Sequence, residues 1–277
     1  MNHPNILLIF ADQFRYDCLG CTGHPFIKTP NLDQLAREGI IFTHAFTPIP
    51  LCVPSRTSLL YGQWSTSHLA IANADSEAPR PAKAGLTSFS QLLNEAGYLL
   101  QWVGKWGLSP ETNPFQVGFH SYISDKEYPR WRSELGLPPK PHMNTWFGEV
   151  DAGIKPEQSR LGWGASQVIN LLERLPGDRP FFIRWDTTEP HLPNIVPEPY
   201  CSLYPPATIP PWRSFPDPLH HKPYIQAQQR RTWKLEGWSW EKWAPIVSRY
   251  LGEISLLDAQ VGRILEALER LHLAENT

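Results

Sequence analysis

The sequence predicts an α/β domain with a mostly parallel central sheet flanked by helices. Three short apolar runs bounded by polar residues, 5–10, 98–103 and 179–185, have the composition of parallel strands that are buried on both faces. Amphipathic helical patterns lie between and after them, over residues 29–39, 87–96, 161–175 and 241–268. At 277 residues the chain is long enough to bury one substantial core of this kind.

Composition excludes several classes of function. The formal net charge is −2, so no basic field indicates nucleic acid, and no apolar run is long enough to span a membrane. The first residues, Met1–Asn5, carry no basic segment or cleavage-like site, and we expect a cytoplasmic protein. The four cysteines do not resemble a disulfide framework. We expect Cys18 and Cys21 to be structural thiols, with zinc binding or redox use as the alternatives.

The first predicted strand ends on Asp12 and Gln13. Open α/β sheets bind their ligands at the carboxyl ends of the strands, although an isolated Asp in such a place commonly caps the next turn. A capped helix follows over residues 29–39. Residues 40–46 are strand-like, and we expect them to lead the chain to Cys52.

Cys52 begins a second predicted helix, in which Pro54 suits the first turn and Gly62 the position after the last. The free N–H groups and the dipole at a helix N-terminus favour anions. Arg56 adds a fixed cation about one turn into the helix, which suits an oxyanion such as sulfate or phosphate. An isolated cysteine would more often be a buried structural residue.

Polar residues also follow the second and third strands. Lys105 comes directly after residues 98–103, and His191 lies in a Pro-rich loop after residues 179–185. Either residue alone would be interpreted as an ordinary surface side chain. His68 follows the Cys52 helix and has a structural or a catalytic role.

An irregular segment, residues 197–243, precedes the last helix and is rich in Pro, Trp and basic residues. The chain's 12 Trp and 29 Pro are high numbers for its length, so we expect an ordered aromatic connection and not a flexible linker. Its tryptophans form an apolar wall at the entrance of a site or pack beneath a long loop: Trp212, Trp233, Trp238 and Trp240.

Five segments resemble, in order along the chain, the type I sulfatases. The string Cys-x-Pro-Ser-Arg at 52–56 is similar to the signature of that family. The other matches are the opening at 5–13, the helix Thr-Pro-Asn-Leu-Asp-x-Leu-Ala-x-Glu-Gly at 29–39, Gly-Lys-Trp at 104–106, and Pro-Phe-Phe with Pro-His-x-Pro within 180–193. The resemblance implies the sulfatase and alkaline phosphatase-like fold.

The resemblance also implies a covalent mechanism. In this family the signature cysteine is oxidised to Cα-formylglycine, so Cys52 would be a substrate for a formylglycine-generating enzyme and then, as the hydrate, the nucleophile. The expected roles of the other residues follow from the same matches. Asp12, Gln13 and modified Cys52 would hold a divalent cation, with Ca²⁺ expected; Arg56 and Lys105 would stabilise charge on the sulfuryl group; His191 would contact the ester oxygen.

Three departures qualify that expectation. Gln13 stands where a second Asp is commoner, and Gly107 stands where the family has a His after Gly-Lys-Trp. The strand that completes the family's metal site does not follow the last helix before Thr277. We therefore expect residues 1–277 to form an incomplete catalytic domain, with weak metal binding and little turnover. We also expect apolar surface to be exposed along the helix that contains Val247–Leu268.

The expected substrate is a small-molecule or carbohydrate sulfate ester. A phosphonate monoester or phosphodiester hydrolase of the same superfamily is one alternative, and a non-catalytic fragment that binds an anion or a partner is another. We expect no nucleic-acid or membrane partner. Association of copies through an exposed sheet edge is an additional expectation.

Overall fold

The computed structural model describes residues 3–73, 81–215 and 217–277, and its architecture confirms the predicted α/β class. Four parallel strands form the central sheet in the order β1-β5-β2-β3. Their bounds are Ile6–Phe10 for β1, Leu99–Gly104 for β2, Ser121–Ser124 for β3 and Phe181–Asp186 for β5. Because Phe10 and Gly104 both pair with Asp186, three strands end at one level of the sheet.

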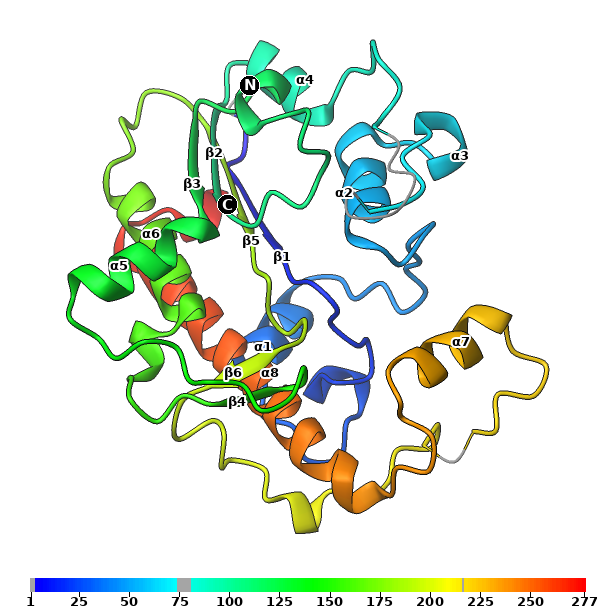
Figure 1. Cartoon of the computed structure of the whole chain (residues 1–277). Coiled ribbons are helices and arrows are strands. Elements are labelled where there is room, and N and C mark those ends of the chain that lie inside the picture. The colour runs from blue at the N-terminus through cyan, green and yellow to red at the C-terminus, as the bar shows by residue number, and fades with distance from the viewer. Residues whose placement is uncertain (1–2, 74–80, 216) are drawn as a thin grey trace.

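Helices cover both faces of this sheet (Figure 1). On one face lie α2 (Cys52–Tyr61) and α4 (Phe89–Glu95), and on the other lie α6 (Arg160–Glu173) and α8 (Trp240–Arg270). The other α-helices are α1 (Pro30–Glu38), α3 (Ser65–His68), α5 (Tyr128–Glu134) and α7 (Tyr224–Thr232). A small second parallel sheet consists of β4 (Gly148–Val150) and β6 (Asn194–Val196).

Alternation along β5 divides its side chains between the two helical layers. Phe181, Ile183 and Trp185 pack in the core with α6 and α8, while Phe182 packs in the core with α2 and α4. The continuous apolar run that predicted a doubly covered strand therefore reflects two separate cores.

The last helix is buried, contrary to our expectation. Val247, Ile254, Val261 and Leu268 on α8 are at most 4% exposed. They pack against α6, β5 and the loop after β1, so no open apolar stripe runs along these positions of the helix. Asp258 of α8 also accepts hydrogen bonds from the first backbone N–H groups of α1, which joins these two helices.

Two local predictions were wrong. Residues 40–46 form no strand, and Ile40, Phe42 and Phe46 are 81%, 78% and 87% exposed. Strand-like composition needs a neighbouring strand, and within the described residues this stretch pairs with none. The segment 197–243, predicted to be irregular, contains the helix α7, whose polar sequence lacks an apolar face to reveal it.

The cysteines fit the structural interpretation. All four are free, and Cys18 lies in the core beside α8. Burial raises the pKa of the Cys18 thiol to about 12, so it stays protonated and unreactive near neutral pH. None of the helices among the described residues is both long and apolar enough to cross a membrane.

Candidate active site

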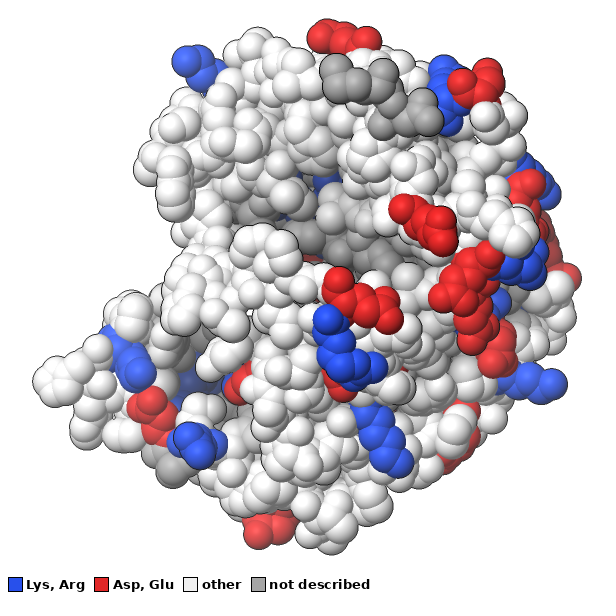
Figure 2. Space-filling model, turned by 180° about the vertical axis from the view of Figure 1, so that it is seen from behind, with Lys and Arg blue, Asp and Glu red and all other residues white. Residues whose placement is uncertain are grey.

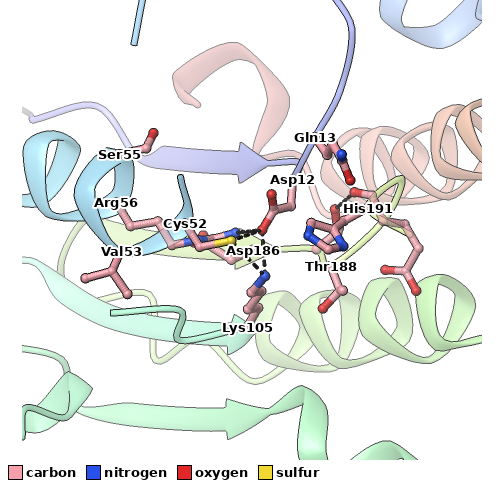
Figure 3. Close-up of polar contacts among 12 residues, drawn as sticks. Asp12, Gln13, Cys52, Val53, Ser55, Arg56, Lys105, Asp186, Thr188 and His191 are labelled. Atoms are coloured by element: carbon pink, nitrogen blue, oxygen red, sulfur yellow. Dashed lines mark hydrogen bonds and ion pairs between the residues drawn. The ribbon is translucent and has the colours of Figure 1, made fainter. Parts of the chain in front are cut away.

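Three predicted residues meet where β1, β2 and α2 come together (Figure 3). Asp12 follows β1, Lys105 follows β2, and Cys52 is the first residue of α2. The Cys52 Sγ atom lies 3.5 Å from both Asp12 Oδ2 and Lys105 Nζ, and Lys105 Nζ donates to Asp12 Oδ2 at 2.6 Å. The sheet register thus brings together side chains that are 93 residues apart in sequence.

Arg56 lies beneath this group, with its guanidinium fully buried. Its Nη2 donates to Asp12 Oδ2 at 3.0 Å, and its Nη1 donates to the carboxylate of Asp186. Burial alone raises the pKa of Asp12, but the adjacent Lys105 and Arg56 outweigh it and hold that pKa below its usual value. Asp12 is therefore an anion in the native protein near neutral pH.

Asp186, at the end of β5, is a site residue that sequence reasoning missed. Besides the contact with Arg56, its carboxylate accepts hydrogen bonds of 2.6 and 2.7 Å from Arg184, and both residues are fully buried. The Arg184 guanidinium also lies 4.0 Å from the centroid of the Trp102 ring. Arg184 and Asp186 are two residues apart in an apolar strand, so their side chains lie on one face of the sheet. This pair of opposite charges was the signal in the sequence that could have identified Asp186.

The helix N-terminus contributes less to anion binding than expected. Asn73, also missed, accepts from the backbone N–H of Val53 at 3.1 Å through its Oδ1. Pro54 has no N–H, so two of the first three positions of α2 are not available to a ligand. The cationic side chains of Lys105 and Arg56 are therefore the main groups for an oxyanion.

His191 and Gln13 lie to the right of Asp12 in Figure 3, whereas Lys105 lies below it. His191 Nδ1 lies 2.6 Å from the carbonyl oxygen of Leu192, which can only accept, so Nδ1 carries a proton and Nε2 remains for a ligand. Gln13 has φ of 58°, a strained conformation for a residue with a side chain. Tyr250 of α8 fixes that conformation by donating to the Gln13 carbonyl at 2.8 Å.

These residues surround a cavity of about 560 Å³. Asp12, Gln13, Cys52, Arg56 and His191 all line it, and Lys105 reaches it through its contacts with Asp12 and Cys52. Figure 2 shows the surface hollowed beside a projecting segment, with charges of both signs scattered over this face. A cavity with a nucleophilic atom between an anion and cations suits transfer of a charged group.

Comparison with known proteins identifies the family. The profile of the sulfatase family matches residues 4–277. The chain belongs to the sulfatase family. An arylsulfatase of Clostridium perfringens is 29% identical over 99% of this chain and 61% of its own length. Human iduronate 2-sulfatase is 30% identical over 99% of this chain and 53% of its own length.

A solved structure supports the same fold. The phosphonate monoester hydrolase of Agrobacterium radiobacter superimposes with a TM-score of 0.78 at 25% identity, over 99% of this chain and 61% of that one. The sulfatase-family chain described here thus spans roughly half to three fifths of the length of these relatives.

Sulfatases generally use formylglycine and a divalent cation, and calcium fits the family. Among the described residues of this chain, one group of three side chains could hold a metal ion: ligand atoms of Asp12, Cys52 and His191 lie within 4.8 Å of one another. Ca²⁺ takes about six to eight oxygen ligands, whereas sulfur and nitrogen suit softer metals. The Gln13 side-chain oxygen accepts from the backbone N–H of Leu192 at 3.4 Å, and Asp12 Oδ2 already accepts from two cationic side chains. These residues do not by themselves complete a Ca²⁺ site.

Gly107 lies against the side chain of Arg56. Gly107 has φ of 58°, and a Cβ atom there would lie 2.7 Å from Cδ and from Nε of Arg56. The stem of Arg56 occupies the space that a side chain at position 107 would need. A side chain at position 107 would therefore require Arg56 to move.

His68 has a structural position in this sulfatase-family chain. It is fully buried, its Nε2 lies 2.9 Å from Ser58 Oγ, and its Nδ1 accepts from the N–H of Ala70 at 3.1 Å. The contact with Ser58 joins α3 to α2. It does not line the Cys52 cavity.

Proposed function

We propose that this chain forms one sulfatase-like catalytic domain of a hydrolase that cleaves sulfate monoesters. Its nucleophile is formylglycine made from Cys52. The observation that supports this most is the position of Cys52 Sγ, 3.5 Å from both Lys105 Nζ and Asp12 Oδ2 at the wall of the cavity. A reacting group at this position has a cation beside it and a buried guanidinium below it.

The charges near the cavity suit a substrate with one negative charge. Arg56, Lys105 and Arg184 are linked by ion pairs to two carboxylates, Asp12 and Asp186. Three cations and two anions leave a surplus of one positive charge. A sulfate monoester carries one negative charge and would neutralise it in a partly buried setting, where such attraction is strong.

Each residue has a role that its geometry supports. Formylglycine would supply a hydrated aldehyde: one hydroxyl would attack sulfur as the alcohol departs, and the second would then expel sulfate and restore the aldehyde. Lys105 would direct N–H donors toward the negative oxygens of the sulfuryl group, and buried Arg56 would add positive charge beneath them; Asp12 holds both cations in place before substrate arrives. His191 has its Nδ1–H fixed on a carbonyl, and in its doubly protonated form it would give the Nε2 proton to the departing alcohol and become a neutral imidazole.

Hydrolysis of phosphonate monoesters or phosphodiesters is the second candidate. The structural likeness to a phosphonate monoester hydrolase supports it, and those substrates also carry a single negative charge. A non-catalytic, anion-binding role is the third candidate, since it needs only the cations of the cavity.

One experiment separates the three. The chain is co-produced with a formylglycine-generating enzyme and assayed on aryl sulfate, aryl phosphonate monoester and aryl phosphodiester, with added Ca²⁺ and with chelator, beside Cys52→Ala. Fastest Cys52-dependent turnover of the sulfate supports the first proposal, and fastest turnover of a phosphorus ester supports the second. Binding of inorganic sulfate without turnover of any ester supports the third.

A further inference from the structure

A second cavity, of about 690 Å³, lies beside the candidate active site between α7 and the start of α8. We call it the tryptophan groove, after the aromatic residues in its walls: Trp212, Trp233, Trp238, Trp240 and Trp243. Figure 1 shows α7 standing apart from the sheet, across from α2. The sulfate-ester chemistry assigned to the Cys52 cavity makes no use of this groove.

The groove adjoins the Cys52 cavity. Gln229 and Trp233, at the end of α7, line both spaces. Trp146 lines the Cys52 cavity, and its ring lies edge-on to that of Trp233 with centroids 6.3 Å apart. Trp146 and Trp233 are 55% and 39% exposed, so both rings are accessible to a ligand that occupies the two spaces. A molecule with its sulfate at Cys52 would extend into the groove.

The aromatic faces of the groove are held by packing. Buried Phe147 contacts the rings of Trp238 and Trp243, with centroids 5.5 Å away in each case. Trp240 donates from Nε1 to the carbonyl of Ile209 at 2.8 Å. Rings fixed in this way lose little freedom when a ligand packs on them, which favours binding.

Polar groups lie between these aromatic faces, and their charges balance. Arg15 and Arg230 line the groove together with Asp217 and Glu236, two cations with two carboxylates. Arg15 is further neutralised by Asp17 at 2.7 Å and lies 4.4 Å from the centroid of the Trp212 ring. The groove therefore has no surplus cation for a second sulfate.

We propose that the tryptophan groove binds an uncharged sugar unit linked to the sulfated part of the substrate. The inference rests on the proposed sulfate-ester function of the Cys52 cavity. A sugar ring has an apolar C–H face that packs on an indole and hydroxyl groups at its rim that pair with amide and charged side chains. An apolar aglycone would leave those side chains unpaired, and a polysulfated chain would find no cations in excess.

The test is a microarray of oligosaccharides that carry no sulfate, one sulfate or several sulfates, probed with the full 277-residue chain. Singly sulfated oligosaccharides of two or more units should bind best. Trp233→Ala, which removes one ring face, should weaken that binding about tenfold, the worth of one aromatic contact. Gln229→Ala should weaken it as well and keeps the test independent of any effect of Trp233→Ala on folding. Trp64→Ala, at a Trp that is 70% exposed and does not line the groove, should have no effect.

Three outcomes would overturn the inference. They are equal binding of sulfated single sugars and oligosaccharides, preference for multiply sulfated chains, and binding that survives both groove substitutions. A titration with inorganic sulfate distinguishes failure of the proposed function from failure of the groove inference. If inorganic sulfate binds to wild type and Trp233→Ala alike but the array shows no oligosaccharide preference, the groove inference alone fails. If inorganic sulfate does not bind to wild type, the proposed function fails first.

Discussion

Asp186 shows how much of the candidate site depends on one buried carboxylate. It pairs with Arg56 and Arg184, and all three side chains are inaccessible to solvent. Removing one member of a buried charge network leaves the remaining charges without compensation. The site's cations therefore keep their positions because an anion lies beneath them.

Asp186→Asn should accordingly destabilise the chain by about 3–5 kcal/mol, because two buried guanidinium groups lose their shared anion. Urea unfolding measures the change. Glu134→Gln is the matched control, since Glu134 pairs with Arg130 at the surface and should show no measurable effect. Equal stability of the two variants would mean that Asp186 does not hold these arginines.

Gly107 offers a second test at the residue scale. Gly107→Ala should cost more stability than Gly62→Ala, although both glycines have φ near 60°. The left-handed conformation costs each alanine about 1 kcal/mol or more. Only the Cβ atom at position 107 meets another side chain, that of buried Arg56. Denaturant unfolding and sulfate titration of both variants measure the difference, and indistinguishable variants would contradict the packing described.

Lys105 should matter for anions more than for folding. Lys105→Met keeps the aliphatic length and removes a charged donor, so sulfate or vanadate binding should weaken about tenfold or more. The melting temperature should change little, because the Lys105 side chain is 21% exposed and Asp12 keeps its bond to Arg56. Lys126→Met, at an exposed lysine, is the control. A large loss of stability with unchanged anion binding would show that Lys105 has a structural role.

At the scale of elements, His68 joins α2 to α3 as a neutral imidazole. Burial lowers its pKa, so the unfolded chain takes up the proton first as the pH falls. His68 therefore contributes its full stability above about pH 6.5, and the contribution is lost progressively as the pH drops below that value.

The prediction is that the free energy of unfolding of wild type falls between about pH 6.5 and 5 more steeply than that of His68→Gln. Denaturant unfolding at several pH values gives both slopes. His44→Gln, at an exposed histidine, should keep the slope of wild type. Parallel slopes for wild type and His68→Gln would exclude this role.

Most elements of the core were predictable because their signals are local. Apolar runs with sharp polar ends predicted β1, β2 and β5, and Pro54 and Gly62 marked the limits of α2. The secondary structure of other segments could not be predicted, because it depends on contacts with residues that are distant in sequence. Residues 40–46 have strand composition but no strand beside them among the described residues, and α7 lacks an apolar face to reveal its period.

The candidate site followed the same rule. Lys105 and His191 were predicted from the resemblance to the sulfatase motifs, and the parallel sheet places the strand ends that they follow at one edge. Asp186 and Asn73 were missed, since each acts through a group remote in sequence, Arg56 in one case and the N–H of Val53 in the other. Burial of α8 was also misjudged, because its cover comes from α6 and β5 and not from a strand that follows it.

At the scale of the whole molecule, distant segments converge on one cavity. The ends of β1 and β2, the start of α2 and the loop after β5 supply Asp12, Lys105, Cys52 and His191. We infer that these side chains converge there to serve a modified Cys52.

Mass spectrometry of the peptide that contains Cys52 measures directly whether Cys52 is converted to formylglycine. The chain is co-produced with a formylglycine-generating enzyme and treated with an aldehyde-reactive probe, beside Pro54→Ala, which alters the signature string. We expect loss of the Cys52 sulfur and labelling of the resulting aldehyde in wild type, with little or no conversion in Pro54→Ala. An unmodified Cys52 thiol in folded wild-type protein would contradict this expectation.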